Sequence, residues 1–191
     1  SVVLTVPLPI RNAPAATQVA ALALTKVIRN LYGLNAAIKW PNDILIHNKK
    51  IAGILAEMQA DQDQVKFLVI GIGINVNQLP GELSGPFRYP ATSLAAEIGE
   101  FVNRQELFLA FLRQFESEYD LFLSKGLTAI LPELEAASAV IGKAVTIHSE
   151  RGEFCGKALG FTPEGALRLS TGDKDEIVVW VGDVTRVEGT F

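Results

Sequence analysis

The sequence of 191 residues contains little that binds transition metals or forms disulfides, with one cysteine and two histidines. Because Cys155 has no second cysteine to pair with, an internal disulfide is excluded, and we expect a cytoplasmic protein. His47, His148 and Cys155 are too few to form a typical structural zinc site. We therefore predict no metal-ligating residues in the chain.

The sequence also lacks a basic excess and a long apolar run. It has 17 lysine and arginine residues against 21 aspartate and glutamate residues, so its net charge is −4. That charge gives a nucleic-acid partner no electrostatic support, and we predict that the chain does not bind DNA. A run of about 18 apolar residues is also missing, so we predict no membrane-spanning segment. A composition with 49% hydrophobic and 20% charged residues is that of a core-rich globular protein.

The first part of the chain combines a helical apolar pattern with strands that are joined by short polar loops. Apolar residues recur at helical spacing from about residue 15 until Gly33, where glycine ends the helix. Short connections between strands favour antiparallel pairing, so we predict an α+β fold with a mixed, largely antiparallel sheet and helices on one side. The predicted strands cover 36–40, 43–48, 50–60 and 65–76, and the later helices cover 94–98, 104–123 and 127–137.

The C-terminal part consists of short strands that are separated by glycine-containing turns. We expect five such strands within roughly fifty residues, a pattern typical of a small SH3-like β-barrel. The boundary is predicted near residues 137–141, which gives one domain over 1–137 and a second over 138–191. The clearest strands are Val145–Ile147, Phe154–Gly160, Leu167–Leu169 and Ile177–Trp180.

Polar residues gather at one strand end, in Lys39–Trp40–Pro41–Asn42–Asp43. Pro41 cannot donate to a ladder, so the strand should stop there and leave Asn42 and Asp43 on a turn. A hairpin over 39–57 would bring Asp43 and Lys50 together near one end of the sheet. Taken singly, Lys50 fits a solvated lysine, Trp40 a core residue, and Asn42 with Asp43 an ordinary turn. Their combination favours a site.

Two glycines, Gly71 and Gly73, lie in the strand predicted over 65–76. They do not form a dinucleotide-binding motif, because the third glycine position is Val76 and no helix is predicted after it. Since side chains alternate along a strand, the two glycines leave one face bare, and Asn75 follows on that face. A flat floor for a ligand ring is one interpretation, and close backbone packing is the other.

These segments together resemble the biotin protein ligase family. The resemblance is carried by Lys39–Asp43, Lys50–Glu57, Ile70–Asn77 and Ala91–Leu94, in that order and at similar spacings. Segments around Gly142, Cys155, Gly165 and Gly182 resemble the family's small C-terminal barrel, so the match covers essentially the whole chain. It implies a class II synthetase-like catalytic domain followed by the SH3-like barrel.

The resemblance implies a ligase that makes biotinyl-5′-AMP from biotin and ATP with Mg2+, and then transfers biotin to a lysine. The acceptor would be the biotin carboxyl carrier protein of acetyl-CoA carboxylase, and a homodimer is a further expectation. Lys50 matches the lysine at the acyl phosphate, and Asp43 matches a residue near the incoming amine, so both are assigned as catalytic. The residues implied to bind biotin or nucleotide are Trp40, Asn42, Gly53, Gly71, Gly73 and Asn75.

One part of the family pattern is missing. Family members carry a serine/threonine and glutamine segment and a glycine–arginine-rich loop ahead of the strand that residues 1–8 resemble. We therefore expect a fragment with impaired ligase activity, lacking also a DNA-binding winged helix. Two alternatives stay open, a non-catalytic ligase-like module that binds a small molecule or a protein, and a lipoate-type ligase. The segments Trp40–Asp43 and Gly71–Asn75 favour biotin over lipoate.

Overall fold

The computed structural model describes residues 2–4, 8–9, 13–61, 64–83, 90–172 and 175–189, and its larger sheet is built around a long antiparallel pair, β5 and β6. The strand order is β1-β6-β5-β4-β3, with β2 also paired to β6. Among the described residues, the strand pairings of this sheet are all antiparallel, whereas a mixed, largely antiparallel sheet was predicted. Of the strand predicted over 1–8, residues 1 and 5–7 lie outside the described residues. The strands are β1 (Val2–Leu4), β2 (Leu8–Pro9), β3 (Ala36–Lys39), β4 (Asp43–Ile46), β5 (Lys49–Asp61) and β6 (Gln64–Ile74).

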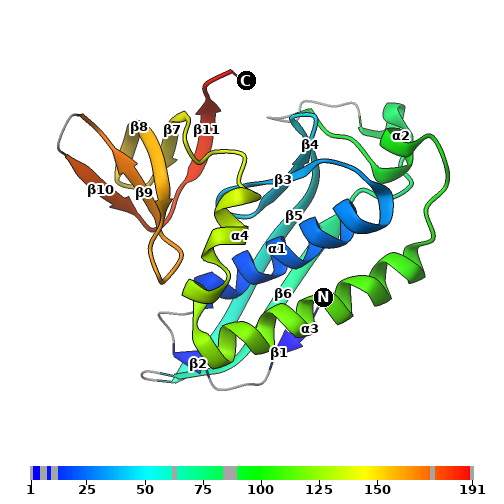
Figure 1. Ribbon diagram of the computed structural model, residues 1–191, viewed down its shortest axis with the longest axis horizontal. Helices are drawn as coiled ribbons and strands as arrows, with labels where there is room; N and C mark the ends of the chain where they lie inside the picture. The colour runs from blue at the N-terminus through cyan, green and yellow to red at the C-terminus, as the bar shows by residue number, and fades with distance from the viewer. Residues whose placement is uncertain are drawn as a thin grey trace.

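Two long helices, α1 (Ala13–Tyr32) and α3 (Arg104–Lys125), run side by side across one face of this sheet (Figure 1). α1 is apolar around most of its circumference, and Ala20, Leu24 and Ile28 are completely buried. A helix of this kind has to be covered on more than one side. The sheet and α3 provide that cover, so the predicted arrangement of helices on one side of the sheet is confirmed.

The remaining helices are short. They are η2 (Pro80–Leu83), α2 (Leu94–Ile98), η3 (Leu127–Ala129) and α4 (Leu131–Ala136). The prediction of one continuous helix over 127–137 is wrong, because the structure has a 3-10 turn followed by α4. Pro132 stands in the first turn of α4, where its missing N–H is tolerated, whereas a helix running through it would lose a hydrogen bond. Within the described parts of the chain, no helix is both long and apolar enough to cross a membrane.

The second sheet contains five antiparallel strands in the order β10-β9-β8-β7-β11. The predicted strand number is confirmed, but β10 and β11 are not paired in the part of the chain that the structure describes. The sheet is therefore an open antiparallel one, and the closed barrel that was expected is not seen. The strands are β7 (Ala144–Ser149), β8 (Gly152–Phe161), β9 (Leu167–Ser170), β10 (Glu176–Val179) and β11 (Asp183–Val187).

The segment that leads from α4 to the second sheet is tied to the edge strand β3. The N–H of Ile38 donates to the carbonyl of Ala137 at 2.8 Å, and the N–H of Ala139 donates to the carbonyl of Ile38 at 2.8 Å. These bonds anchor the connection next to Lys39, the last residue of β3, where the polar segment begins.

Candidate active site

Asp43 and Lys50 form an ion pair within the β4–β5 hairpin, and the predicted proximity of the two residues is confirmed. The Nζ of Lys50 lies 2.5 Å from Oδ1 of Asp43. The side chain of Lys50 is 40% exposed and that of Asp43 is 10% exposed, so the pair is anchored in the protein but reachable from solvent. A cation at such a position suits the stabilisation of negative charge that develops on a phosphate oxygen.

A β-bulge places Lys50 on the correct face of the sheet. Asp43 is paired with Gly53 and Ile44 with Ala52, but Leu45 is paired with Lys50, so Ile51 is an extra residue on β5. Strict alternation would put Lys50 and Gly53 on opposite faces because they are three residues apart. The bulge re-aims Lys50 toward Gly53 and Asp43. Nothing in the sequence predicts this bulge, because a β-branched residue at Ile51 gives no signal for one.

Gly53 provides the space in which the ion pair lies. A Cβ atom on Gly53 would be 3.1 Å from Nζ of Lys50 and 3.5 Å from Oδ1 of Asp43. Gly53 pairs with Gly73 on β6, where a Cβ would approach only the carbonyl oxygen of Gly53, at 4.0 Å. Two facing glycines therefore leave a flat patch of backbone beside the Lys50–Asp43 pair.

A cavity of about 640 Å³ opens over this patch. Four of the sequence-predicted site residues line it, namely Lys50, Gly53, Gly73 and Asn75. Gly71 does not line it, since it lies two residues further along β6, opposite Leu55. The floor predicted from two glycines of one strand is thus made by glycines of two neighbouring strands.

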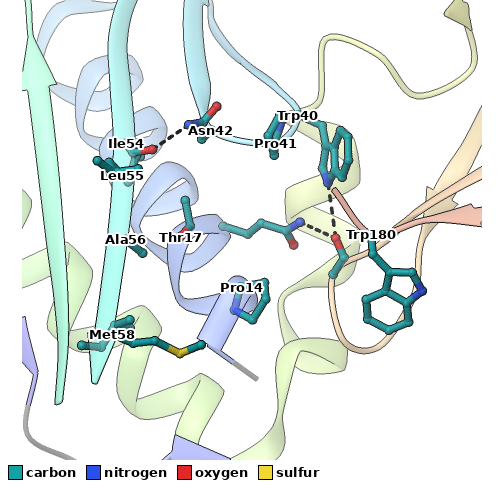
Figure 2. A pocket seen from close by; sticks show the side chains of 13 residues that line it. Pro14, Thr17, Trp40, Pro41, Asn42, Ile54, Leu55, Ala56, Met58 and Trp180 are labelled. Atoms are coloured by element: carbon teal, nitrogen blue, oxygen red, sulfur yellow. Dashed lines mark hydrogen bonds between the residues drawn. The ribbon is translucent and has the colours of Figure 1, made fainter. Parts of the chain in front are cut away.

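Trp40 and Asn42 lie in a different cavity, of about 280 Å³, between β5, the start of α1 and the second sheet (Figure 2). The side-chain amide of Asn42 donates to the carbonyl of Ile54 at 2.8 Å, which holds the turn against β5. Trp40 is 2% exposed, and its Nε1 faces the carbonyl of Gly165 at 3.4 Å. The peptide bond between Trp40 and Pro41 is cis.

The backbone of Lys50 is fixed by the segment that follows the loop after β6. The N–H of Lys50 donates to the carbonyl of Pro90 at 2.8 Å, and the N–H of Thr92 donates to the carbonyl of Lys50 at 3.0 Å. The hydroxyl of Thr92 donates to Glu97 at 2.6 Å, and Nδ1 of His47 lies 2.8 Å from the same carboxylate. Sequence reasoning missed Thr92 and Glu97 as supports, although Ala91–Leu94 was part of the resemblance.

The environment of Glu97 favours its charged form. Burial raises the pKa of this carboxyl, but the hydrogen bonds from Thr92 and His47, together with the charge of Lys49, outweigh burial. The pKa of Glu97 therefore lies below its ordinary value. An ionised Glu97, in α2, thus connects His47 at the tip of the β4–β5 hairpin with Thr92 in the segment before α2.

The chain is similar in sequence to known proteins. Residues 1–75 match the Biotin/lipoate A/B protein ligase family. The Bifunctional ligase/repressor BirA of Bacillus subtilis is 40% identical over 173 residues, which are 91% of this chain and 53% of that relative. The Biotin--[acetyl-CoA-carboxylase] ligase of Paracoccus denitrificans is 34% identical over 159 residues, which are 79% of this chain and 64% of that relative.

The fold is shared with a solved structure. The biotin protein ligase from Aquifex aeolicus in complex with biotin and ATP superimposes with a TM-score of 0.77 at 23% identity. The superposition covers 93% of this chain and 75% of that chain. The chain spans about half of the length of the Bacillus relative, at 53%.

Proposed function

We propose that the chain, whose residues 1–75 match the Biotin/lipoate A/B protein ligase family, attaches biotin to a lysine of a biotin carboxyl carrier domain at the expense of ATP. The names of the Bacillus and Paracoccus relatives, a ligase/repressor and a biotin–carboxylase ligase, support the reaction and the acceptor. The two-layer α+β fold that the chain shares with the Aquifex structure is compatible with it.

One observation carries the proposal. The ammonium of Lys50, paired with Asp43, lies against the glycine patch at Gly53 and Gly73, at the edge of a cavity that Asn75 also lines. A flat ligand ring needs a bare backbone floor, and an acyl phosphate needs a cation within reach. The site provides both through Gly53, Gly73 and Lys50, whereas Gly71, outside this cavity, is assigned to the site by the resemblance alone.

In the first step, a carboxylate oxygen of biotin attacks the α-phosphorus of ATP. A new O–P bond forms, the bond from the α-phosphorus to the bridging oxygen breaks, and pyrophosphate leaves with that electron pair. Lys50 would donate a hydrogen bond to the phosphoryl oxygens, on which negative charge develops. Asn75 would contact the nucleotide from β6.

In the second step, the amine of the carrier lysine attacks the acyl carbon of biotinyl-5′-AMP. An amide bond forms, the acyl C–O bond breaks, AMP leaves with the electron pair, and the attacking nitrogen loses a proton. Asp43 is the nearest carboxylate to Lys50 and would accept that proton or hold the amine in place. Trp40 and Asn42 would shape the approach from the side of the second cavity.

Mg2+ would arrive with the nucleotide. In sites of this kind it is usually held by one or two carboxylates together with phosphate oxygens. The described residues contain no group of three or more histidine, cysteine, aspartate or glutamate side chains that could hold a metal alone. Asp43 offers a single carboxylate at the site, which fits a magnesium ion carried mainly by ATP.

The domain division, the oligomeric state and the location are also part of the proposal. We assign residues 1–137 to the catalytic domain and residues 138–191 to a second domain of SH3-like architecture, supported by its five short antiparallel strands. A homodimer and a cytoplasmic site of action are also part of the proposal. Light scattering of the purified chain across a concentration series tests the dimer.

The proposal is tested by biotin-dependent exchange of pyrophosphate into ATP, measured on the whole chain. We expect exchange with biotin, none with lipoate, and a loss of at least about 100-fold in Lys50→Ala, because the phosphate loses its cation. Lys49→Ala is the matched control, since Lys49 is the neighbouring lysine and contacts Glu97 instead. Exchange with lipoate alone would support the lipoate-type ligase. Absence of exchange with binding of biotinyl-5′-AMP in calorimetry would support the non-catalytic module.

A further inference from the structure

Lys39 is a buried cation between two carboxylates that belong to different sheets. Its side chain is 1% exposed. Its Nζ lies 3.8 Å from Oδ2 of Asp43 and donates a hydrogen bond to Oδ1 of Asp183 at 3.1 Å. A buried ammonium needs anionic partners to offset the loss of water. Asp43 and Asp183 provide them.

This arrangement connects the second sheet to the proposed catalytic lysine. Asp183 is the first residue of β11, and Asp43 is the first residue of β4. Because Oδ1 of Asp43 contacts Lys50 while Oδ2 faces Lys39, one carboxylate is shared by two lysines. The ionic contacts therefore run in series, from Asp183 through Lys39 and Asp43 to Lys50.

The residues before and after Lys39, Ile38 and Trp40, also form hydrogen bonds with the C-terminal part of the chain. Ile38 exchanges backbone hydrogen bonds with Ala137 and Ala139, in the connection to the second sheet. Trp40 points its Nε1 at the carbonyl of Gly165, which also accepts a hydrogen bond of 2.6 Å from the amide of Gln18 (Figure 2). Three consecutive residues ahead of the turn are thus fixed by the C-terminal part of the chain.

We infer that Lys39 is a positioning residue for Lys50 and that Asp183 is its anchor in the second domain. Lys39 lines neither cavity, so it acts through Asp43 and does not touch the ligand. The positive charge of Lys39 competes for the Asp43 carboxylate and so weakens the attraction between Asp43 and Lys50. The catalytic consequence of this arrangement rests on the proposed ligase function, whereas the arrangement itself does not.

Two substitutions should change the reactivity of the Lys50 amine in opposite directions. Lys39→Met removes the competing cation, so Asp43 holds the ammonium of Lys50 more tightly and leaves it less available to an acylating reagent. Asp183→Asn removes a counterion of Lys39, which then draws more strongly on Asp43 and weakens its hold on Lys50. General loosening of the fold would change the reactivity of Lys50 in the same direction in both variants.

The experiment is competitive acylation of the whole chain by a small amine-reactive ester, with the labelled peptides quantified by mass spectrometry. The reference within each sample is Lys66, whose side chain is 51% exposed and paired with Asp61 at 2.5 Å. We expect labelling of Lys50 to fall about threefold or more in Lys39→Met and to rise about threefold in Asp183→Asn, because charges this close together interact strongly.

Two further variants complete the design. Asp183→Glu should return the labelling rate toward that of the wild type, because it restores the carboxylate. Glu188→Gln makes the same change of charge just beyond β11 and should leave the rate unchanged. If Lys39→Met does not fold, as judged by circular dichroism, the rise in labelling in Asp183→Asn and its reversal in Asp183→Glu decide the question. Changes in one direction for both Lys39→Met and Asp183→Asn, or no change in either, would overturn the inference.

The same preparations separate this inference from the proposed function. Opposed shifts in labelling together with an absence of pyrophosphate exchange in the wild type would support the ionic connection and count against ligase activity. Exchange in the wild type with identical labelling in all variants would support the ligase and overturn the role of Lys39. With both present, Asp183→Asn should lower kcat more than it raises KM for ATP, since Lys50 acts on developing charge.

Discussion

A Cβ atom on Gly53 would lie 3.1 Å from Nζ of Lys50. The absence of a side chain at Gly53 therefore leaves the space that the Lys50 ammonium occupies over β5. The same Cβ would be 3.5 Å from the carboxylate of Asp43. Contacts this tight force the lysine to move by a few tenths of an ångström or more. The reactivity of the site is therefore sensitive to the size of residue 53.

We predict that Gly53→Ala lowers kcat for biotin-dependent pyrophosphate exchange by roughly 10-fold to 100-fold, because small displacements of a catalytic group carry such costs. Gly81→Ala is the control, since a Cβ at Gly81 meets no atom within 4 Å. Gly73→Ala should instead weaken ligand binding, because its Cβ would stand in the open cavity. An unchanged kcat in Gly53→Ala would contradict the role of this glycine.

A second prediction concerns the ionic contacts between α1, α3 and α4. Nζ of Lys26 lies 2.6 Å from Glu118 and 2.6 Å from Glu133. Since Glu118 is buried, Lys26→Met leaves a poorly solvated carboxylate, to which Gln114 alone among the described residues still donates. We expect a loss of about 2 kcal/mol in the free energy of unfolding, less than for a fully buried pair because Lys26 is partly exposed. Urea denaturation measures it, and Lys125→Met should change stability by less than about 0.5 kcal/mol.

The same contacts predict a dependence on alkaline pH. Burial lowers the pKa of Lys26, but the hydrogen bonds that its ammonium donates to Glu118 and Glu133 outweigh burial and raise the pKa above 10.5. A raised pKa in the folded state means that this stabilisation is complete below pH 10.5 and is lost as pH rises through the folded value. Lys26→Met should therefore flatten the fall in stability between pH 10 and 12, about where lysine titrates. An equally steep fall in the variant would count against this assignment.

A third prediction concerns Glu97 and acid pH. Its pKa is lowered in the folded state, so its stabilising contribution is present above 4.5, the ordinary value, and is lost as pH falls through the folded value. Glu97→Gln removes this dependence and should cost about 1 kcal/mol at pH 7, since it weakens bonds to Thr92 and His47. Urea denaturation at pH 7 and near pH 3.5 measures both effects. Glu100→Gln, an exposed carboxylate beyond α2, serves as the control.

The sequence predicted local features of the fold and site, and these are the ones that local rules determine. Pro41 and the following polar turn predicted the hairpin that joins Asp43 to Lys50, and helical periodicity predicted α1 and α3. The bulge at Ile51 was not predictable, because it depends on pairing with β4. The contact between Lys39 and Asp183 joins residues 144 positions apart, and neither side chain carries a local signal for it.

The last prediction concerns the contact between the β8–β9 turn and α1. Gly165 has a φ of +92°, in the region that favours glycine, and a Cβ on it would be 2.7 Å from Oε1 of Gln18. Gly142 has a φ of +82° but would meet no atom within 4 Å, so Gly142→Ala measures the backbone cost alone, about 1 kcal/mol. Gly165→Ala adds a clash at the junction of the two sheets.

We expect Gly165→Ala to lower the free energy of unfolding by about 2–3 kcal/mol, roughly 1–2 kcal/mol more than Gly142→Ala, since overpacking at a close contact carries that cost. Denaturation followed by the fluorescence of Trp40 and Trp180 measures this difference, because Trp40 faces the carbonyl of Gly165 and Trp180 lines the same cavity. Equal losses in the two variants would mean that the turn does not press on Gln18, and that the second sheet is held to α1 by other contacts. A larger loss of unfolding free energy in Gly165→Ala, accompanied by faster proteolysis between α4 and β7, would show that contacts of this turn keep the second sheet packed beside Trp40.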